Sequence, residues 1–185
     1  GKENQGLPNF NVALERDKMN IGNTLREAGY TTGFVGKFHL TSKLDFPEFY
    51  KGKEKWIDIP KSAKLGPETS AQFKHNEQWS RRYLKALGFS WAKNVYPENT
   101  PSPYSVHNPE WTTVAALEFI EQNKDGPFYL HLCSTLLHGP DKSWRKSMDS
   151  PLITGEGEIK SLPKVMTPRA ELLKTIKEKG FDPNS

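Results

Sequence analysis

Lys37 and His39 lie two residues apart at the end of a short apolar segment, and together they could bind an anion and move a proton. Alternate residues of a strand point to the same side of a sheet, so both side chains should face the same way. Lysine supplies a positive charge with three donors, whereas histidine gains or loses a proton near neutral pH. The pair therefore suits an anionic group that undergoes proton transfer, such as an acid ester. On spacing alone, a surface lysine and a packed or solvated histidine at a strand end are the favoured interpretation.

A short helix followed by a strand should position this pair. Asn20 is predicted to cap the helix, and Gly29 is predicted to end it in the left-handed conformation that favours glycine. The strand is then predicted to cover residues 31–38, with Lys37 near its end and His39 directly after it.

A second helix and strand follow further along the chain. Asn108 and Pro109 predict a helix start, with the asparagine as the cap and the proline in the first turn. The residues expected to form its buried stripe are Trp111, Val114, Leu117 and Ile120. Residues 128–134 are largely apolar on both faces, which predicts an interior strand. Helix followed by strand occurs twice, and this indicates an α/β fold.

The remaining segments carry weaker patterns. Residues 41–107 contain many prolines and read as a long irregular connection, apart from a helix over 76–87 that Gly88 closes. Near the end of the chain, a helix should run from a cap at Thr167 to Gly180, with Phe181 folding back against it.

The composition describes a turn-rich globular chain. It has 185 residues, 35% of them hydrophobic, with 14 glycines and 14 prolines, enough for one ordinary domain or part of a larger one. The net charge is +4, and the basic residues are scattered among acidic ones. The sequence lacks the basic stripe interleaved with aromatic residues that would indicate nucleic-acid binding. No apolar run approaches the roughly 20 residues that cross a bilayer. A single cysteine, Cys133, rules out a disulfide within the chain.

Two motifs resemble conserved segments of the type I sulfatases, in the alkaline phosphatase superfamily. Residues 29–40 read GYTTGFVGKFHL and resemble the family's GKWHL segment, with Phe38 in place of the usual tryptophan. Residues 126–140 read GPFYLHLCSTLLHGP and resemble its strand followed by a Pro-His loop, with Leu137 where many relatives have proline. The two motifs occur in the family's order. The resemblance implies a partial alkaline phosphatase-like α/β/α sandwich with a long irregular connection.

The resemblance also implies roles for three residues. Lys37 would contact the sulfate and the formylglycine oxygens, and His39 would hydrogen-bond the formylglycine hydroxyl as a general base. His138 would donate to the bridging ester oxygen and so stabilise the leaving alkoxide. The alternative for His138 is a loop histidine packed on Pro140 or Trp144.

The family's nucleophile and metal motifs do not occur in this sequence. Sulfatases convert a cysteine in a C-x-P-S-R context to formylglycine, and Cys133 has no such context. The chain therefore reads as the central part of a sulfatase catalytic domain. We expect no metal ligands or cofactor in it, although the resemblance implies calcium and formylglycine for the intact enzyme. Its expected segments are a strand-end motif (29–40), the connection (41–107), a helix, strand and loop (108–141), and a C-terminal loop and helix (142–185).

Other titratable residues are expected to be structural. His131 should be a core histidine paired with a neighbour, and Cys133 a buried thiol. His75 and His107 lack partners at metal-ligand spacing, which favours surface or capping roles. Asp141 is a loop-turn aspartate that could also orient His138.

The leading hypothesis is thus a segment of a sulfatase that acts on sulfate esters, with carbohydrates as one substrate class, and that is inactive on its own. One alternative is a non-catalytic or degenerate module that binds anionic glycans. Another is a phosphonate or phosphodiester hydrolase segment of the same superfamily. The expected partners are a sulfated small molecule or glycan, and a second copy or other sulfatase segments covering exposed strand edges. The resemblance implies a periplasmic, secreted or lysosomal location, which the sequence itself does not fix.

Overall fold

The computed structural model describes residues 14, 18–39, 47–60, 62–97, 100, 104–135, 152–159, 161 and 167–181. Its described part is built on a parallel sheet with the strand order β2-β1-β3, in which β1 is Thr31–Lys37, β2 is Trp91–Tyr96 and β3 is Phe128–Cys133. The helices are α1 (Ile21–Glu27), α2 (Pro67–Ala86), α3 (Asn108–Asn123) and α5 (Arg169–Glu178), with a short 3-10 helix η2 (Pro47–Tyr50). A small hairpin joins β4 (Ile153–Thr154) to β5 (Gly157–Glu158). No helix in these ranges is both long and apolar enough to cross a membrane.

Local sequence signals account for the entry into β1. The Asn20 side chain accepts hydrogen bonds from the backbone N–H groups of Gly22 and Asn23, and Asn23 in turn accepts from the Asn20 backbone. This reciprocal cap fixes the start of α1. Gly29 ends the turn with a φ of 89°, and β1 begins two residues later. The predicted helix, cap and glycine are therefore confirmed.

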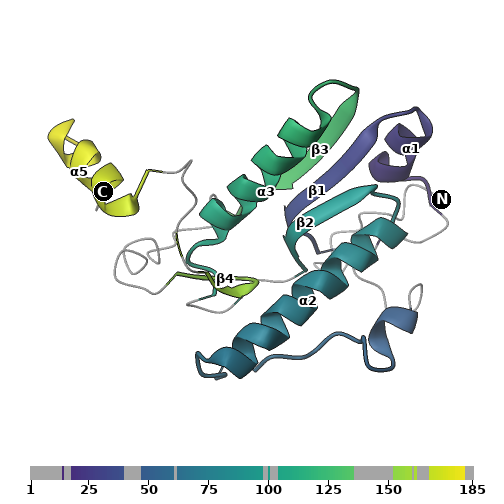
Figure 1. Cartoon of the computed structure of the whole chain (residues 1–185), viewed down its shortest axis with the longest axis horizontal. Helices are drawn as coiled ribbons and strands as arrows, with labels where there is room; N and C mark the ends of the chain where they lie inside the picture. Colours follow the sequence, from purple (N-terminus) through teal and green to yellow (C-terminus); the bar gives the residue numbers. More distant parts are fainter. Residues whose placement is uncertain are drawn as a thin grey trace.

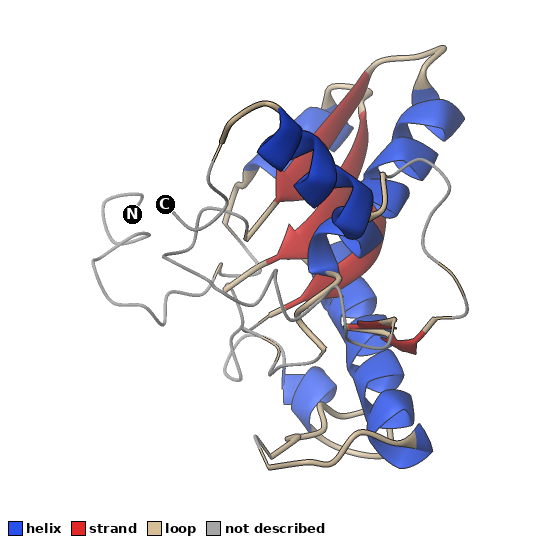
Figure 2. Ribbon diagram, turned by 90° about the vertical axis from the view of Figure 1, so that its left-hand side faces the viewer, coloured by secondary structure: helices blue, strands red, loops and turns tan. Residues whose placement is uncertain are grey.

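Helices cover the two faces of the sheet, as Figure 2 shows. Phe34 of β1 packs with α2 residues such as Tyr83 and Leu84 in the main core. Its neighbour Gly33 faces the other way, since a side chain there would meet the ring of Phe119 on α3. Successive strand residues point to opposite faces, so α2 and α3 lie on opposite sides of the sheet. The predicted α/β/α arrangement is confirmed.

The connection over 41–107 contains more regular structure than the sequence predicts. The expected helix over 76–87 is the second half of α2, which starts at Pro67. Strand β2, at residues 91–96, was not predicted at all. It pairs in parallel with β1 and has an irregularity between the partners of Phe34 and Gly36, where Asn94 adopts a φ of 53°.

Helix α3 differs from the prediction at its start and on its buried face. His107 occupies the cap position, and Asn108 is already helical, with its side-chain amide donating to Thr100 Oγ1 at 3.3 Å. Leu117 and Ile120, predicted to be buried, are 44% and 39% exposed. The residues that are buried on α3 are Asn108, Glu110, Trp111, Thr112, Ala115, Ala116 and Phe119.

Strand β3 forms one edge of the described sheet. Its residues are half-buried, and Leu132 is 49% exposed, so it is not covered on both faces as an interior strand would be. Figure 1 shows β3 on the far side of β1 from β2. At the other end of the chain, α5 closes as predicted: Gly180 has a φ of 78° and the Phe181 N–H donates to Ile176 O at 3.2 Å.

Candidate anion-binding site at the carboxyl edge of the sheet

Lys37 and His39 emerge at the carboxyl end of the central strand. Lys37 is the last residue of β1 and is half-buried, while His39 is exposed. Between them, Phe38 is 2% exposed and its ring packs against those of Phe34 and Tyr83. Phe38 thus anchors the end of β1 on the α2 side of the sheet. That Lys37 and His39 face the same way remains a prediction.

Gly36 brings the end of β1 unusually close to β3. Its φ is 96°, and a Cβ placed there would lie 2.1 Å from the carbonyl oxygen of Cys133, its register partner. Only glycine combines this backbone conformation with this spacing. Lys37 therefore follows a tight contact with β3 and lies beside the point where β3 ends.

The ends of the three strands are also linked by hydrogen bonds. Tyr96, the last residue of β2, is the register partner of Lys37, and its backbone oxygen accepts a 2.9 Å hydrogen bond from the Phe38 N–H. Burial raises the pKa of Tyr96, while hydrogen bonds with the side chains of Thr135 and Asn108 oppose that rise. A neutral tyrosine hydroxyl therefore ties the end of β2 to the chain leaving β3 and to the start of α3.

The Tyr96 link was not predicted from the sequence. Tyr96 belongs to a strand that the pattern did not reveal, and its pairing with Thr135 depends on both strands flanking β1. The one available signal was the aromatic residue directly before Pro97, at the end of a short apolar run.

His138 and Asp141 lie outside the described residues. The described chain leaves β3 at Cys133 and runs to Thr135, three positions before His138. The structure therefore brings Lys37 and the end of β3 to one edge of the sheet, and the predicted convergence of His138 with them remains a prediction.

Two groups on β3 behave as structural residues. His131 Nδ1 is 2.7 Å from the Tyr129 hydroxyl and its ring centroid is 4.9 Å from that of Phe34, while burial lowers the His131 pKa. Burial likewise raises the pKa of the half-buried Cys133 thiol. A thiol held in its neutral form is a poor nucleophile, so Cys133 fits a packing role.

The two remaining histidines of the described chain also have structural contacts. His75 Nε2 lies 2.7 Å from the Lys55 carbonyl oxygen. His107 occupies the cap position of α3 but makes no side-chain cap hydrogen bond there. It is 2% exposed, and its Nδ1 lies 3.4 Å from Glu110 Oε1. A surface role for His107 is therefore wrong.

The described residues do not fit the calcium or the formylglycine that the resemblance implies. Within these ranges, no cluster of three or more histidine, cysteine or acidic side chains could hold a metal ion. Cys133 is followed by Ser134 and Thr135 and lies within a strand, where no C-x-P-S-R turn is present.

Comparison with known proteins identifies the family. A search of curated proteins returned no match. A protein-family model described as Sulfatase matches residues 3–149, which is most of the chain and includes β1, β2, β3 and the helices between them. This chain therefore belongs to the sulfatase family of sulfate ester hydrolases, in the alkaline phosphatase-like superfamily.

Proposed function

We propose that this chain supplies the sulfate-binding and leaving-group side of a sulfatase site. Lys37 binds the sulfate group, His39 accepts or donates a proton beside it, and His138 donates to the bridging oxygen of the ester. The expected substrate is a sulfate ester of a carbohydrate or a similar alcohol. Such alcohols are poor leaving groups, and a proton placed on the departing oxygen lowers the barrier to breaking the S–O bond.

The observation that carries the proposal is the position of Lys37 and His39. They follow the central strand of a parallel sheet, at the carboxyl edge where open α/β sheets place ligands. The ammonium of a half-buried lysine is less screened by water than one at the surface, which strengthens its attraction for an anion.

The link between Tyr96 and Thr135 supports a shared site. This link joins β2 to the segment that leads to His138. The link lies next to Lys37, because Tyr96 and Lys37 are register partners. Tyr96 is a positioning residue in this proposal, because it holds the two strand ends without touching the substrate.

Binding of inorganic sulfate tests the proposal without requiring turnover. Isothermal calorimetry with the chain should give saturable binding that Lys37→Met weakens about 10-fold to 100-fold, the usual value of a hydrogen bond to a charged group. Lys124→Met is the matched control, because Lys124 is exposed and pairs with Glu121 at the far end of α3. Equal affinity in the wild type and Lys37→Met would reject the role of Lys37.

A second titration separates sulfuryl from phosphoryl chemistry. Methyl sulfate should compete with inorganic sulfate for the site at least as well as methyl phosphonate does. A clear preference for the phosphonate would instead favour a phosphonate or phosphodiester hydrolase.

A further inference from the structure

A cavity of about 130 Å³ lies between α2, the segment around Trp56 and the end of β2. One water needs roughly 10–15 Å³ of such space, so the cavity has room for several waters or a small molecule. Glu77 lines it from α2 and Tyr96 from β2. Tyr96 is the register partner of Lys37, so this wall of the cavity belongs to the strand beside Lys37.

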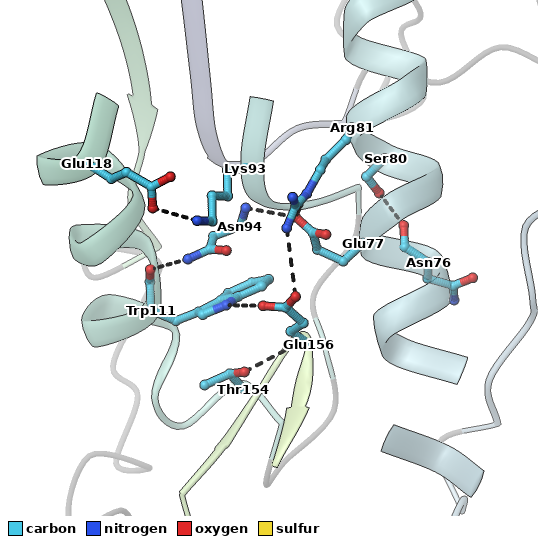
Figure 3. A network of polar contacts seen from close by, with 10 residues as sticks. All are labelled: Asn76, Glu77, Ser80, Arg81, Lys93, Asn94, Trp111, Glu118, Thr154 and Glu156. Carbon is cyan, nitrogen blue, oxygen red and sulfur yellow. Dashed lines mark hydrogen bonds and ion pairs between the residues drawn. The ribbon is translucent and has the colours of Figure 1, made fainter. Parts of the chain in front are cut away.

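Glu77 presents an unpaired acceptor at this cavity. The residue is 2% exposed, and its Oε1 accepts from Arg81 Nε at 2.6 Å and from the Asn94 backbone N–H at 2.8 Å. Figure 3 shows the carboxylate held by both donors. Its Oε2 is buried and has no hydrogen-bond partner. A buried carboxylate oxygen without a donor is costly, which indicates that something in the cavity donates to it.

The polar neighbours on α2 hydrogen-bond to groups other than Glu77 Oε2. The Asn76 side-chain oxygen accepts a 3.0 Å hydrogen bond from the Ile57 N–H, and its amide nitrogen donates to the Ile57 carbonyl oxygen at 2.8 Å. The Ser80 hydroxyl donates to the Asn76 carbonyl oxygen at 2.8 Å. Both residues line the cavity with Glu77, and neither hydrogen-bonds to its Oε2.

The charge around the cavity favours a cation. Asp58 lies at its exposed rim, and none of its described lining residues is lysine, arginine or histidine. Arg81 is the nearest cation in the network, but it is shared between Glu77 and Glu156, whose Oε1 lies 3.7 Å from Arg81 Nη2. The cavity and this network together therefore carry three carboxylates and one guanidinium. An anion such as sulfate would be repelled here, in contrast to the site beside Lys37.

The cavity walls suit an ammonium group on a short apolar stem. Trp56 and Phe73 line the cavity together with Ile59 and Val95. Aromatic faces attract ammonium ions, and apolar walls pack against methylene groups.

We propose that this cavity binds a small primary amine, whose ammonium group donates to Glu77 Oε2 and to Asp58. The site is separate from the sulfate site and does not depend on sulfatase chemistry. It requires only the shape and charge of the pocket beside β2.

Ethanolamine and its neutral analogue ethylene glycol test the proposal on the chain. In a backbone amide NMR titration, ethanolamine should shift the Asn94 resonance saturably, because that N–H donates to Glu77. Ethylene glycol should bind about tenfold or more weakly, because it lacks the charge. Shifts that never saturate, or equal binding of the two compounds, would overturn the proposal.

Variants locate the site. Glu77→Gln should weaken ethanolamine binding about 10-fold to 100-fold, whereas Glu118→Gln should leave it unchanged, because Glu118 pairs with Lys93 and does not line the cavity. Asp58→Asn lies at the exposed rim and should fold normally while losing affinity, which keeps the test valid if Glu77→Gln does not fold. Full affinity in a folded Glu77→Gln or Asp58→Asn variant would sink the assignment. Sulfate binding should stay normal in Asp58→Asn, which separates this site from the one at Lys37.

Discussion

Replacing Gly36 with alanine should damage both the fold and the proposed sulfate site. The new Cβ would lie 2.1 Å from the Cys133 carbonyl oxygen, whereas carbon and oxygen atoms in close contact sit about 3.3–3.6 Å apart. The clash is with backbone on both sides, so no side chain can rotate to relieve it. Strands β1 and β3 must separate by more than an ångström, and Lys37 must move with the end of β1.

The loss of stability can be divided into two parts. Alanine at a φ of 96° costs about 1–2 kcal/mol for the left-handed backbone alone. Separating the strands costs a few ladder hydrogen bonds at about 1 kcal/mol each. The total is about 3–5 kcal/mol, a large share of the roughly 5–15 kcal/mol that stabilises a typical domain.

Gly29→Ala is the matched control, because it isolates the backbone part. Gly29 has nearly the same φ, 89°, but no atom lies within 4 Å of the position that a Cβ would take there. Urea unfolding followed by tryptophan fluorescence should therefore show a loss of about 1–2 kcal/mol for Gly29→Ala, and at least twice that loss, or no soluble protein, for Gly36→Ala. Equal losses in the two variants would refute the steric argument.

Four further outcomes are expected. The purified chain should not hydrolyse an aryl sulfate, because Cys133 lacks the nucleophile context, and metal-dependent turnover would contradict this. In an active sulfatase containing the chain, His138→Ala should slow release of sugar alcohols about 100-fold to 10,000-fold more than release of activated phenols; equal losses would exclude proton donation. Burial raises the Glu77 pKa above its ordinary value of 4.5. The native state then holds the Glu77 proton more tightly than the unfolded chain does. The unfolding free energy of the wild type should therefore fall relative to that of Glu77→Gln as pH rises above 4.5. Unfolding free energies that change in parallel with pH in the two proteins would reject this. Light scattering should detect self-association of the chain. The association should be weaker in Leu132→Lys, because Leu132 is exposed on the edge strand β3. A stable wild-type monomer would contradict the prediction.

The elements that the sequence predicted well are those fixed by local contacts. The cap at Asn20, the left-handed Gly29 and the closure of α5 by Gly180 and Phe181 each depend on residues within about one helical turn. The strand predicted over 31–38 closely follows Gly29 and is found as β1, Thr31–Lys37.

Helix α3 shows how an incorrect period misplaces a buried face. The predicted stripe at Trp111, Val114, Leu117 and Ile120 advances by three residues at each step. A helix turns about 100° per residue, so nine residues from Trp111 to Ile120 bring the side chain to the opposite side. Ile120 is accordingly exposed, whereas Ala115 and Phe119, four and eight residues after Trp111, are buried with it.

Strand β2 was missed because its polar residues are satisfied by distant partners. Lys93 pairs with Glu118 at 2.5 Å, and the Asn94 side-chain amide donates to the Trp111 carbonyl oxygen at 2.5 Å. Both partners belong to α3, and the irregularity at Asn94 breaks the strand alternation. The link from Tyr96 to Thr135 was hidden for the same reason, since it joins segments that only the parallel sheet brings together.

The two proposed sites lie on different sides of the end of β1, and this predicts how they respond to strain. The amine cavity is tied to β1 through the Phe38 N–H and the Tyr96 carbonyl oxygen, on the β2 side. The close contact at Gly36 is with Cys133, on the β3 side. Strain introduced at Gly36 therefore acts first on Lys37 and on the chain leaving β3, while Glu77 remains held by Arg81 and the Asn94 N–H. In any folded Gly36 variant, sulfate affinity should consequently fall before amine affinity does.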